Sequence, residues 1–354
     1  MRKLFLFITL FSLSLLGQTK KFEKIDSIIN AAIGKDDPGV AVGIVKNGVV
    51  VYEYYRGLSN LQHRIPFNEE TRSNIASTAK QFTALMVLDL SLNKKLDLED
   101  DFRKYLPSLY KYVRDTIKIR HLLNHTSGVQ EYVDLMSNEG LVWWKRVGLD
   151  NDDIIDLLAK QKELEFKPGT AYSYSNSNYN ILAKIVEKVT GNSFIEHSNT
   201  FFKTLGMKET SFVKRYMGVI PNRANPYSDW GSGEWWETPT VTKTIGEGFL
   251  FTTLKDQLLY EQKLQSAAVQ NHLLKISQGT IPNSEIKAYG FGLKLSNRLN
   301  RKAIHHDGVT YGFHSQTLRF PDDKLTIFIM SNNGNFRSDL MADELASELI
   351  YNDK

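Results

Sequence analysis

The sequence predicts an α/β fold of the α+β type. In this fold, one antiparallel sheet is built from both chain ends and flanked by helices, and a mainly helical domain is inserted between its two halves. Three observations predict it: strand-like sequence occurs before residue 60, helical periodicity dominates from about residue 77, and strand-like sequence returns at residue 289. Strands at both ends with helices between them are reconciled most simply if the two ends share one sheet.

The first predicted elements are a helix and a hairpin. Residues Phe22–Ala32 place their apolar side chains on one helical stripe. The run VAVGIVKNGVVVYEYY then puts β-branched residues on both sides of Asn47-Gly48, which is a strong hairpin signal. Another helix is expected from Ser77, because apolar residues recur after it at intervals of three and four.

The later predicted elements comprise four helices, three strands and a loop. The helices are expected at Asp152–Leu158, Tyr179–Val189, Asp256–Ile276 and Ser338–Ile350. The strands are expected at Tyr289–Leu295, Phe313–Phe320 and Leu325–Met330, with a turn at residues 321–324 between the last two.

The segment Pro221–Thr244 is predicted to be a long ordered loop. It is rich in Pro, Gly, Asn and Ser, and its large aromatic residues are Tyr227, Trp230, Trp235 and Trp236. Because binding residues often lie on loops, this composition suggests a lid over a substrate pocket. Core packing of the aromatic residues is the alternative.

Residues 1–17 are predicted to be a signal peptide. Arg2 and Lys3 precede an uncharged run from Leu4 to Leu16, and small Gly17 follows. This run is too short to span a bilayer comfortably, so we expect cleavage near Gly17-Gln18, with an uncleaved anchor as the alternative. The protein is then expected to be exported by a bacterium, to the periplasm or the medium, without stable membrane insertion after cleavage.

The remaining chain is expected to form two intimate domains within one unit. Residues 18–75 and 285–354 would form the discontinuous sheet domain. Residues 76–284 would form the helical domain, which includes the loop at 221–244. We find neither an internal repeat nor a low-complexity tract in the 354 residues.

Composition excludes several classes of function. The chain has 42% hydrophobic and 24% charged residues, which is ordinary for a globular protein, and it has no cysteine, so a thiol nucleophile and disulfides are excluded. The net charge of +4 is too small to indicate nucleic acid as a partner. His121 and His125 are one helical turn apart, but nothing suggests a third ligand, so we expect neither a metal nor a cofactor. A small-molecule or peptide substrate is the expected partner, and the oligomeric state is open.

A serine followed three residues later by a lysine is the first candidate for chemistry. On a helix this spacing places a hydroxyl and an amine on the same side of one turn, where the amine can accept the serine proton. The spacing itself occurs five times: Ser77/Lys80, Ser91/Lys94, Ser108/Lys111, Ser211/Lys214 and Ser284/Lys287. Context favours Ser77 and Lys80, because they lie where strand-like sequence changes to an apolar helix.

Two further motifs occur once each. Tyr174-Ser175-Asn176 is the only Tyr-x-Asn sequence, and His306-Asp307-Gly308 is the only His-x-Gly sequence. A tyrosine and an imidazole both move protons when their surroundings tune them. Gly308 would let a substrate backbone approach a strand closely.

These three motifs resemble those of the serine β-lactamase and penicillin-binding-protein superfamily, in its class C-like branch. They are Ser77-Thr78-Ala79-Lys80, Tyr174-Ser175-Asn176 and His306-Asp307-Gly308, in the family's order. The linking sequence is also similar, at His121–Gly128, Lys167-Pro168-Gly169-Thr170, Asn178-Tyr179-Asn180, and from Gly312-Phe313-His314 through Pro321 to Ser331-Asn332. The resemblance covers roughly residues 25 to 350.

The resemblance implies a role for each residue of the first two motifs. Ser77 would be the acylated nucleophile, and Lys80 would accept its proton. Tyr174 would act with Lys80 as general base and acid. Asn176 would hold the acyl-side amide of the substrate.

The third motif is implied to bind the substrate and to complete the site. His306 would occupy its first position, where lysine is the other common residue. Asp307 and Gly308 would lie beside the substrate. The backbone N–H groups of Ser77 and Val309 would form the oxyanion hole.

Three departures from the family pattern bear on the substrate. Asp307 stands where a threonine or serine commonly helps to hold a substrate carboxylate, and a carboxylate there would repel one. The alternative is that Asp307 pairs with a neighbouring cation, such as His305 or His306, and presents no net charge to the pocket. His306 replaces a permanently charged lysine with a group that is mostly neutral at pH 7. Glu247, in Gly246-Glu247-Gly248, stands where the family usually has a small residue. The site is therefore expected to favour neutral or cationic esters, amides or peptides over β-lactams.

The sequence thus predicts an exported serine hydrolase that works through a Ser77 acyl-enzyme on an ester, amide or peptide bond. The alternatives are a β-lactamase or a D-alanyl-D-alanine carboxypeptidase, and a penicillin-binding receptor that is acylated without turnover. A catalytically inactive scaffold is disfavoured by the intact Ser77, Lys80 and Tyr174.

Overall fold

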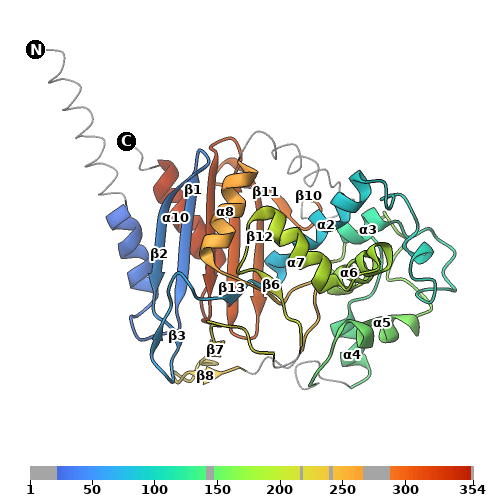
Figure 1. Cartoon of the computed structure of the whole chain (residues 1–354), viewed down its shortest axis with the longest axis horizontal. Helices are drawn as coiled ribbons and strands as arrows, with labels where there is room; N and C mark the ends of the chain where they lie inside the picture. The colour runs from blue at the N-terminus through green and yellow to red at the C-terminus, as the bar shows by residue number, and fades with distance from the viewer. Residues whose placement is uncertain (1–21, 141–146, 216–217, 239–241, 266–287, 352–354) are drawn as a thin grey trace, which may run out of the picture.

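The computed structural model describes residues 22–140, 147–215, 218–238, 242–265 and 288–351. Its centre is a seven-stranded antiparallel sheet in the order β10-β11-β12-β13-β14-β1-β2 (Figure 1). The strands are β1 (Val40–Lys46), β2 (Val49–Arg56), β10 (Ala288–Tyr289), β11 (Lys294–Arg298), β12 (Arg301–Thr310), β13 (Phe313–Phe320) and β14 (Leu325–Ser331). Strand β1 pairs with β14 along its whole length, from Val40 opposite Ser331 to Lys46 opposite Leu325. The two chain ends therefore share one sheet, and the predicted fold class is confirmed.

Strand β1 is apolar and buried from Val40 to Val45 because helices cover both faces of the sheet. Val40, Val42 and Ile44 lie in the same buried cluster as apolar residues of the helix at 22–32 and of α10 (Ser338–Tyr351). On the opposite face, α8 (Leu254–Leu264) packs against β1. A Cβ atom at Gly43 would lie 2.5 Å from Leu258, so α8 approaches the sheet closely at this glycine.

The helices between the two halves of the sheet pack around α6 (Figure 1). They are α2 (Lys80–Leu92), α3 (Ile119–Leu123), α4 (Tyr132–Asn138), α5 (Asn151–Ala159), α6 (Asn176–Thr190) and α7 (Phe194–Leu205). Helix α7 begins with a capping box between Ser193 and Glu196 and ends at Gly206, which adopts the left-handed conformation that favours glycine. Helix α6 contacts α2, α3, α5 and α7, so it organises this region.

Short elements connect these two regions. They are β3 (Leu58–Asn60), β4 (Ile65–Pro66), β5 (Ser73–Asn74), the 3₁₀ helices η1 (Ala76–Ala79) and η2 (Phe102–Lys104), β6 (Ser211–Phe212), β7 (Tyr227–Ser228), β8 (Trp236–Glu237) and β9 (Leu250–Thr252). Strand β9 pairs with both β5 and β6, so it joins the chain before α2 to the chain after α7. Strands β7 and β8 form a hairpin within the predicted loop 221–244.

The predicted strand at Tyr289–Leu295 is wrong. Tyr289 ends β10 and pairs with Lys294 at the start of β11, so the segment turns back on itself. Gly292 permits the turn, because its φ is +78° and the backbone of Gln81 lies 2.8 Å from the position of a Cβ atom there. The long strand β12 and the helices α3, α4 and α7 were not predicted as elements. The last part of the predicted helix Asp256–Ile276 lies outside the described residues.

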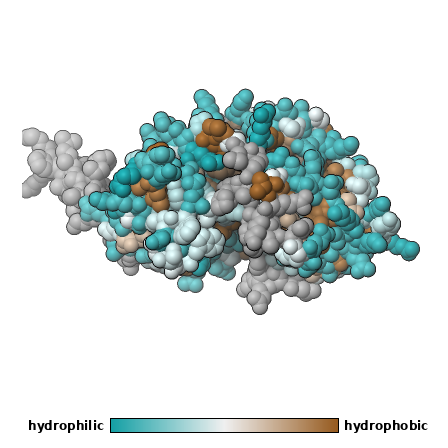
Figure 2. All heavy atoms as spheres, turned by 90° about the horizontal axis from the view of Figure 1, so that it is seen from below, coloured by the Kyte–Doolittle hydropathy of each residue, from teal (hydrophilic) through white to brown (hydrophobic). Residues whose placement is uncertain are grey.

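The surface agrees with a globular protein. Figure 2 shows a mostly hydrophilic face on which hydrophobic residues form small, separate groups. Among the residues that the structure describes, no helix combines the length and apolar composition needed to cross a membrane.

Candidate active site

Ser77 lies in a tight turn between strand β5 and helix α2. The residue before it, Ala76, has a φ of +46°, which is unusual for a residue with a side chain. The Oδ1 atom of Asn74 accepts a hydrogen bond of 2.9 Å from the Ala76 N–H group and supports this conformation. Strained backbone of this kind is found where a functional side chain must be presented in one direction.

Strand β12 packs directly against this turn at Gly308. A Cβ atom on Gly308 would lie 2.2 Å from the Ile75 carbonyl oxygen, so only glycine fits. The same oxygen accepts a hydrogen bond of 2.6 Å from the Ser315 hydroxyl, which also lies 2.8 Å from the Thr78 hydroxyl. We expected Gly308 to admit a substrate backbone, whereas the structure places the Ile75 backbone there.

Lys80 is fully buried and its amine has three polar neighbours. Its Nζ atom lies 2.7 Å from Asn176 Oδ1, 2.7 Å from the Glu247 carbonyl oxygen and 3.3 Å from Ser77 Oγ. The first two neighbours only accept hydrogen bonds. In the neutral amine they bind its two hydrogens, and the lone pair is left for Ser77 Oγ.

The pKa values favour Lys80 as the base that activates Ser77. Burial lowers the pKa of Lys80 to about 8, although the Glu247 and Glu131 carboxylates oppose this effect. Burial raises the pKa of Tyr174 well above its ordinary value, while a hydrogen bond with Ser77 acts in the opposite direction. Near neutral pH, Tyr174 is therefore a phenol beside Ser77, and a fraction of Lys80 is the free amine. The pair can accept and return one proton.

Tyr174 is held by other aromatic rings. Its ring lies 4.3 Å from the ring of His125, centroid to centroid, and 6.2 Å from that of Tyr289. The Nδ1 atom of His125 accepts a hydrogen bond of 3.2 Å from the Ser175 N–H group. Burial, with smaller contributions from Lys80 and other cations, lowers the pKa of His125 well below its ordinary value, so this ring is neutral. His125 is thus a neutral ring that packs against Tyr174. Within the described ranges, no group of three or more His, Asp or Glu side chains is arranged to hold a metal ion.

His306 is buried next to Tyr174 with both ring nitrogens engaged. Nδ1 lies 2.6 Å from the Asp307 carbonyl oxygen, which can only accept, so Nδ1 carries the hydrogen. Nε2 lies 3.0 Å from the Tyr289 hydroxyl and accepts from it. Burial, reinforced by Lys294, lowers the pKa of His306 to about 3. The structure therefore makes His306 a neutral support for Tyr289 and the neighbouring Tyr174.

The carboxylate of Asp307 is paired, which alters the expected charge of the third motif. Lys294, at the start of β11, forms an ion pair and hydrogen bond with Asp307 Oδ1. Burial alone would raise the pKa of Asp307, but His306 and Lys294 hold it below its ordinary value. Asp307 therefore does not present the isolated negative charge that we expected, and Lys294 returns a lysine ammonium to this part of the site.

A cavity of about 140 Å³ opens beside Ser77. Its lining residues are Ala76, Ser77, Tyr132, Val133, Asn176, Glu247, Gly248, Phe249, Val309 and Thr310. Ser77 and Val309, the two residues expected to form the oxyanion hole, thus line the same space. This cavity can accommodate a small acyl group.

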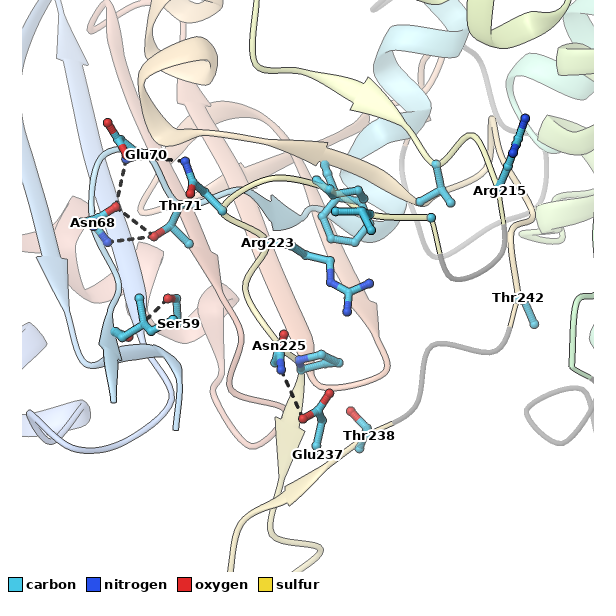
Figure 3. A pocket seen from close by; sticks show the side chains of 18 residues that line it. Ser59, Asn68, Glu70, Thr71, Arg215, Arg223, Asn225, Glu237, Thr238 and Thr242 are labelled. Carbon is cyan, nitrogen blue, oxygen red and sulfur yellow. Dashed lines mark hydrogen bonds between the residues drawn. The ribbon is translucent and has the colours of Figure 1, made fainter. Parts of the chain in front are cut away.

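A larger cavity of about 650 Å³ lies elsewhere and contains none of the predicted site residues (Figure 3). In Figure 3 the Arg223 side chain extends into the space between Asn225 and Arg215. Residues of the predicted lid 221–244 line this cavity, whereas no described part of the lid lines the cavity at Ser77. The described residues of the predicted lid therefore border a different hollow from the one at Ser77.

Sequence reasoning missed two charged residues of the site, Glu131 and Lys294. Glu131, at the start of α4, accepts hydrogen bonds from the backbone N–H and the side-chain amide of Asn176. Burial, together with Glu247, raises the pKa of Glu131 to about 7. No local pattern marks Glu131 or Lys294, because each meets its partner only through tertiary packing.

Comparisons with known proteins agree with this geometry. A sequence model of the family described as Beta-lactamase matches residues 25–349. "Protein flp" of Staphylococcus aureus (strain MRSA252) is 28% identical over 340 residues, which are 93% of this chain and 66% of that protein. "D-aminopeptidase" of Brucella anthropi is 29% identical over 324 residues, which are 86% of this chain and 58% of that protein.

A solved structure shows the same fold. The octameric penicillin-binding protein homologue from Pyrococcus abyssi superposes with a TM-score of 0.82 at 25% identity, over 93% of this chain and 77% of the other. The chain spans just under two thirds of the length of the flp proteins that it matches. Because the family match covers nearly the whole chain and the fold agrees, the chain belongs to the beta-lactamase family.

Proposed function

We propose that the chain is an exported serine hydrolase that forms an acyl-enzyme at Ser77 and cleaves an ester, amide or peptide bond. One observation carries the proposal. The two acceptors at 2.7 Å hold the hydrogens of a neutral Lys80 and leave its lone pair directed at Ser77 Oγ. The relative named D-aminopeptidase supports an amide or peptide substrate.

Intact-mass measurement tests the proposal directly. The protein is incubated with a fluorophosphonate and, separately, with a penicillin, and the mass gain is compared with that of Ser77→Ala. A single fluorophosphonate adduct on the wild type alone supports a reactive Ser77. Absence of any adduct on the wild type would contradict the proposal.

Turnover of a nitrophenyl ester separates a hydrolase from a penicillin-binding receptor. A receptor that is acylated without turnover releases one equivalent of nitrophenol and then stops. A hydrolase continues at a steady rate after any burst. We propose steady turnover, with a β-lactamase or D-alanyl-D-alanine carboxypeptidase as the alternative activities.

Asp307→Thr is expected to raise the rate of acylation by a penicillin by about tenfold, which corresponds to about 1.4 kcal/mol. The substitution removes a carboxylate and frees the Lys294 ammonium, which can then attract a substrate carboxylate. The effect should be largest at low salt, where screening is weakest. The measurement is the acylation rate with one penicillin and one neutral ester.

The matched control for this prediction is Lys294→Met. It leaves Asp307 as an unpaired carboxylate and should slow acylation by the penicillin, with little effect on the neutral ester. If either substitution changes both substrates equally, the Lys294–Asp307 pair is structural and does not set the preference for charge.

The value of kcat/KM for a neutral ester is expected to rise with pH along a limb centred near pH 8. The base is the neutral amine of Lys80, whose fraction increases as the pH passes its lowered pKa of about 8. His306, with a pKa of about 3, should add no limb between about pH 5 and 7.

Glu131→Gln is the control for this pH profile. The Glu131 carboxylate raises the pKa of Lys80, so its removal should move the limb to lower pH. A limb that disappears in Glu131→Gln would instead assign the titration to Glu131, whose own pKa is about 7.

We further propose that residues 1–17 direct export and are then removed. The partner that we propose for the mature protein is a small-molecule or peptide substrate. The uncharged run after Arg2 and Lys3 supports the proposed export. N-terminal sequencing of the protein from the periplasm or culture medium tests it, since a mature chain should begin near Gln18.

A further inference from the structure

The Glu247 carboxylate lies at the edge of the cavity that contains Ser77. Its Oε1 atom accepts hydrogen bonds from the Tyr132 hydroxyl at 3.0 Å and from the Thr244 hydroxyl at 2.7 Å. These two donors fix the orientation of the carboxylate. Its other oxygen, Oε2, lies 3.7 Å from Lys80 Nζ.

The Oε2 atom is available to a water molecule. Its separation from Lys80 exceeds a hydrogen-bond length, and among the described residues no donor forms a hydrogen bond with it. The Glu247 side chain keeps 9% of its surface exposed, and Glu247 lines the cavity that contains Ser77. The cavity of about 140 Å³ has room for a water beside a small acyl group, since one water occupies about 30 Å³ of liquid.

We propose that Glu247 is the general base that activates water to hydrolyse the Ser77 acyl-enzyme. The inference rests on the proposed function and concerns its second half, in which water must reach the ester. Glu247 Oε2 and Ser77 Oγ both lie close to the same Lys80 amine. A water molecule in the cavity can therefore donate a hydrogen bond to Oε2 while its oxygen faces the acyl carbonyl carbon.

The protons balance in this step. Water gives one proton to Glu247 Oε2 as its oxygen bonds to the acyl carbon. The bond between that carbon and Ser77 Oγ then breaks, and Oγ takes a proton from the Lys80 ammonium. The proton on Glu247 returns to the Lys80 amine, and the free acid leaves. No oxidation or reduction takes place.

Lys80 and Glu247 thereby have separate tasks. At neutral pH, a pKa near 8 leaves Lys80 mainly as the ammonium after acylation, which suits it to protonate Ser77 Oγ. A protonated Lys80 cannot also accept a proton from water. A second group must do so, and Glu247 is the carboxylate that lines the same cavity as Ser77.

Glu247→Gln tests the inference, because the amide keeps the size of the side chain and an acceptor for Tyr132 and Thr244. With a nitrophenyl ester, the initial burst should remain within about threefold of the wild-type rate. Steady turnover should fall by about 100-fold or more, as expected for the loss of a general base. Intact-mass measurement should show the acyl-enzyme accumulating.

Glu131→Gln is the matched control, since Glu131 is a second carboxylate near Lys80 that does not line the cavity. Its burst and steady rates should change together. Glu247→Asp provides a second variant if the amide fails to fold, and its shorter carboxylate should slow deacylation more than acylation.

Equal losses of burst and steady turnover in Glu247→Gln would overturn the inference and leave Glu247 as a residue that tunes Lys80. Unchanged steady turnover would overturn it as well. Failure of the proposed function is distinguishable, because the wild type itself would then show neither a burst nor an adduct at Ser77.

Discussion

Replacing Ser77 with alanine is expected to lower turnover of a nitrophenyl ester by at least about 10³-fold while the melting temperature stays close to that of the wild type. The hydroxyl is the group that bonds to the acyl carbon, and it is the hydroxyl that lies 3.3 Å from the Lys80 amine. Ser77 makes few structural contacts, because the turn is supported by Asn74 and Ser315.

Lys80→Ala should be nearly as damaging as Ser77→Ala, and the double variant should be little worse than either one. Residues that act as a unit give strongly non-additive losses. Ser91→Ala is the matched control, since Ser91 and Lys94 have the same spacing outside the site. Full activity in Ser77→Ala with an unchanged melting profile would refute the assignment of the nucleophile.

Replacing Glu261 with leucine is expected to lower the free energy of unfolding by about 3–5 kcal/mol. Glu261 binds Arg319 through two hydrogen bonds, Nε to Oε2 at 2.7 Å and Nη2 to Oε1 at 2.6 Å. Both side chains are buried between α8 and the sheet. Removing the carboxylate leaves an uncompensated guanidinium in the interior.

The same ion pair reaches the active site. Arg319 Nη2 also donates to Gln81 Oε1 at 2.7 Å, and Gln81 Nε2 donates to the Thr78 carbonyl oxygen at 3.0 Å. Glu261→Leu should therefore lower activity as well as stability, because Thr78 and Gln81 flank the segment that carries Lys80.

Denaturant unfolding measures the loss in the free energy of unfolding. The decisive comparison is a double variant in which methionine replaces both Glu261 and Arg319. Two apolar side chains leave no buried charge, so the double variant should be close to the wild type in stability. Asp343→Asn, which weakens the partly exposed pair with Arg298, should cost less than about 1 kcal/mol. A similarly small loss in Glu261→Leu would show that water reaches Arg319.

Local sequence patterns were sufficient to predict those elements whose conformation depends on residues close to each other in the chain. The turn at Asn47-Gly48 joins β1 and β2 as predicted, because two residues that accept positive φ determine a tight hairpin. Helix α10 follows its apolar periodicity. Ser77 and Lys80 were distinguished from four other pairs by the change from strand-like to helical sequence, and the structure places them 3.3 Å apart.

Other features depend on contacts that no short pattern records. Helix α3 has five residues, which is too short for a periodic signal. Asp307 was judged as an isolated charge because its partner, Lys294, lies on the neighbouring strand β11. Glu131 and Glu247 come together only through tertiary contacts, because Glu131 binds Asn176 at the start of α6 and its neighbour Tyr132 binds the Glu247 carboxylate. Because Glu131 and Glu247 are far apart in the chain, no short sequence pattern indicates that they form a cluster.

The pairing of β1 with β14 has a consequence for how the molecule forms during synthesis. Val40 and Ser331 are about 290 residues apart in the chain, and ribosomes add roughly 5–20 residues per second, so β1 waits about 15–60 seconds for its partner. During this time β1 and β2 form at most a two-stranded hairpin, which is only marginally stable by itself. An apolar strand edge is exposed throughout, so a nascent chain is most prone to aggregate or to recruit a chaperone through β1. Strand β1, an inner strand of the sheet, is thus among the first segments to be made and among the last to be paired on both sides.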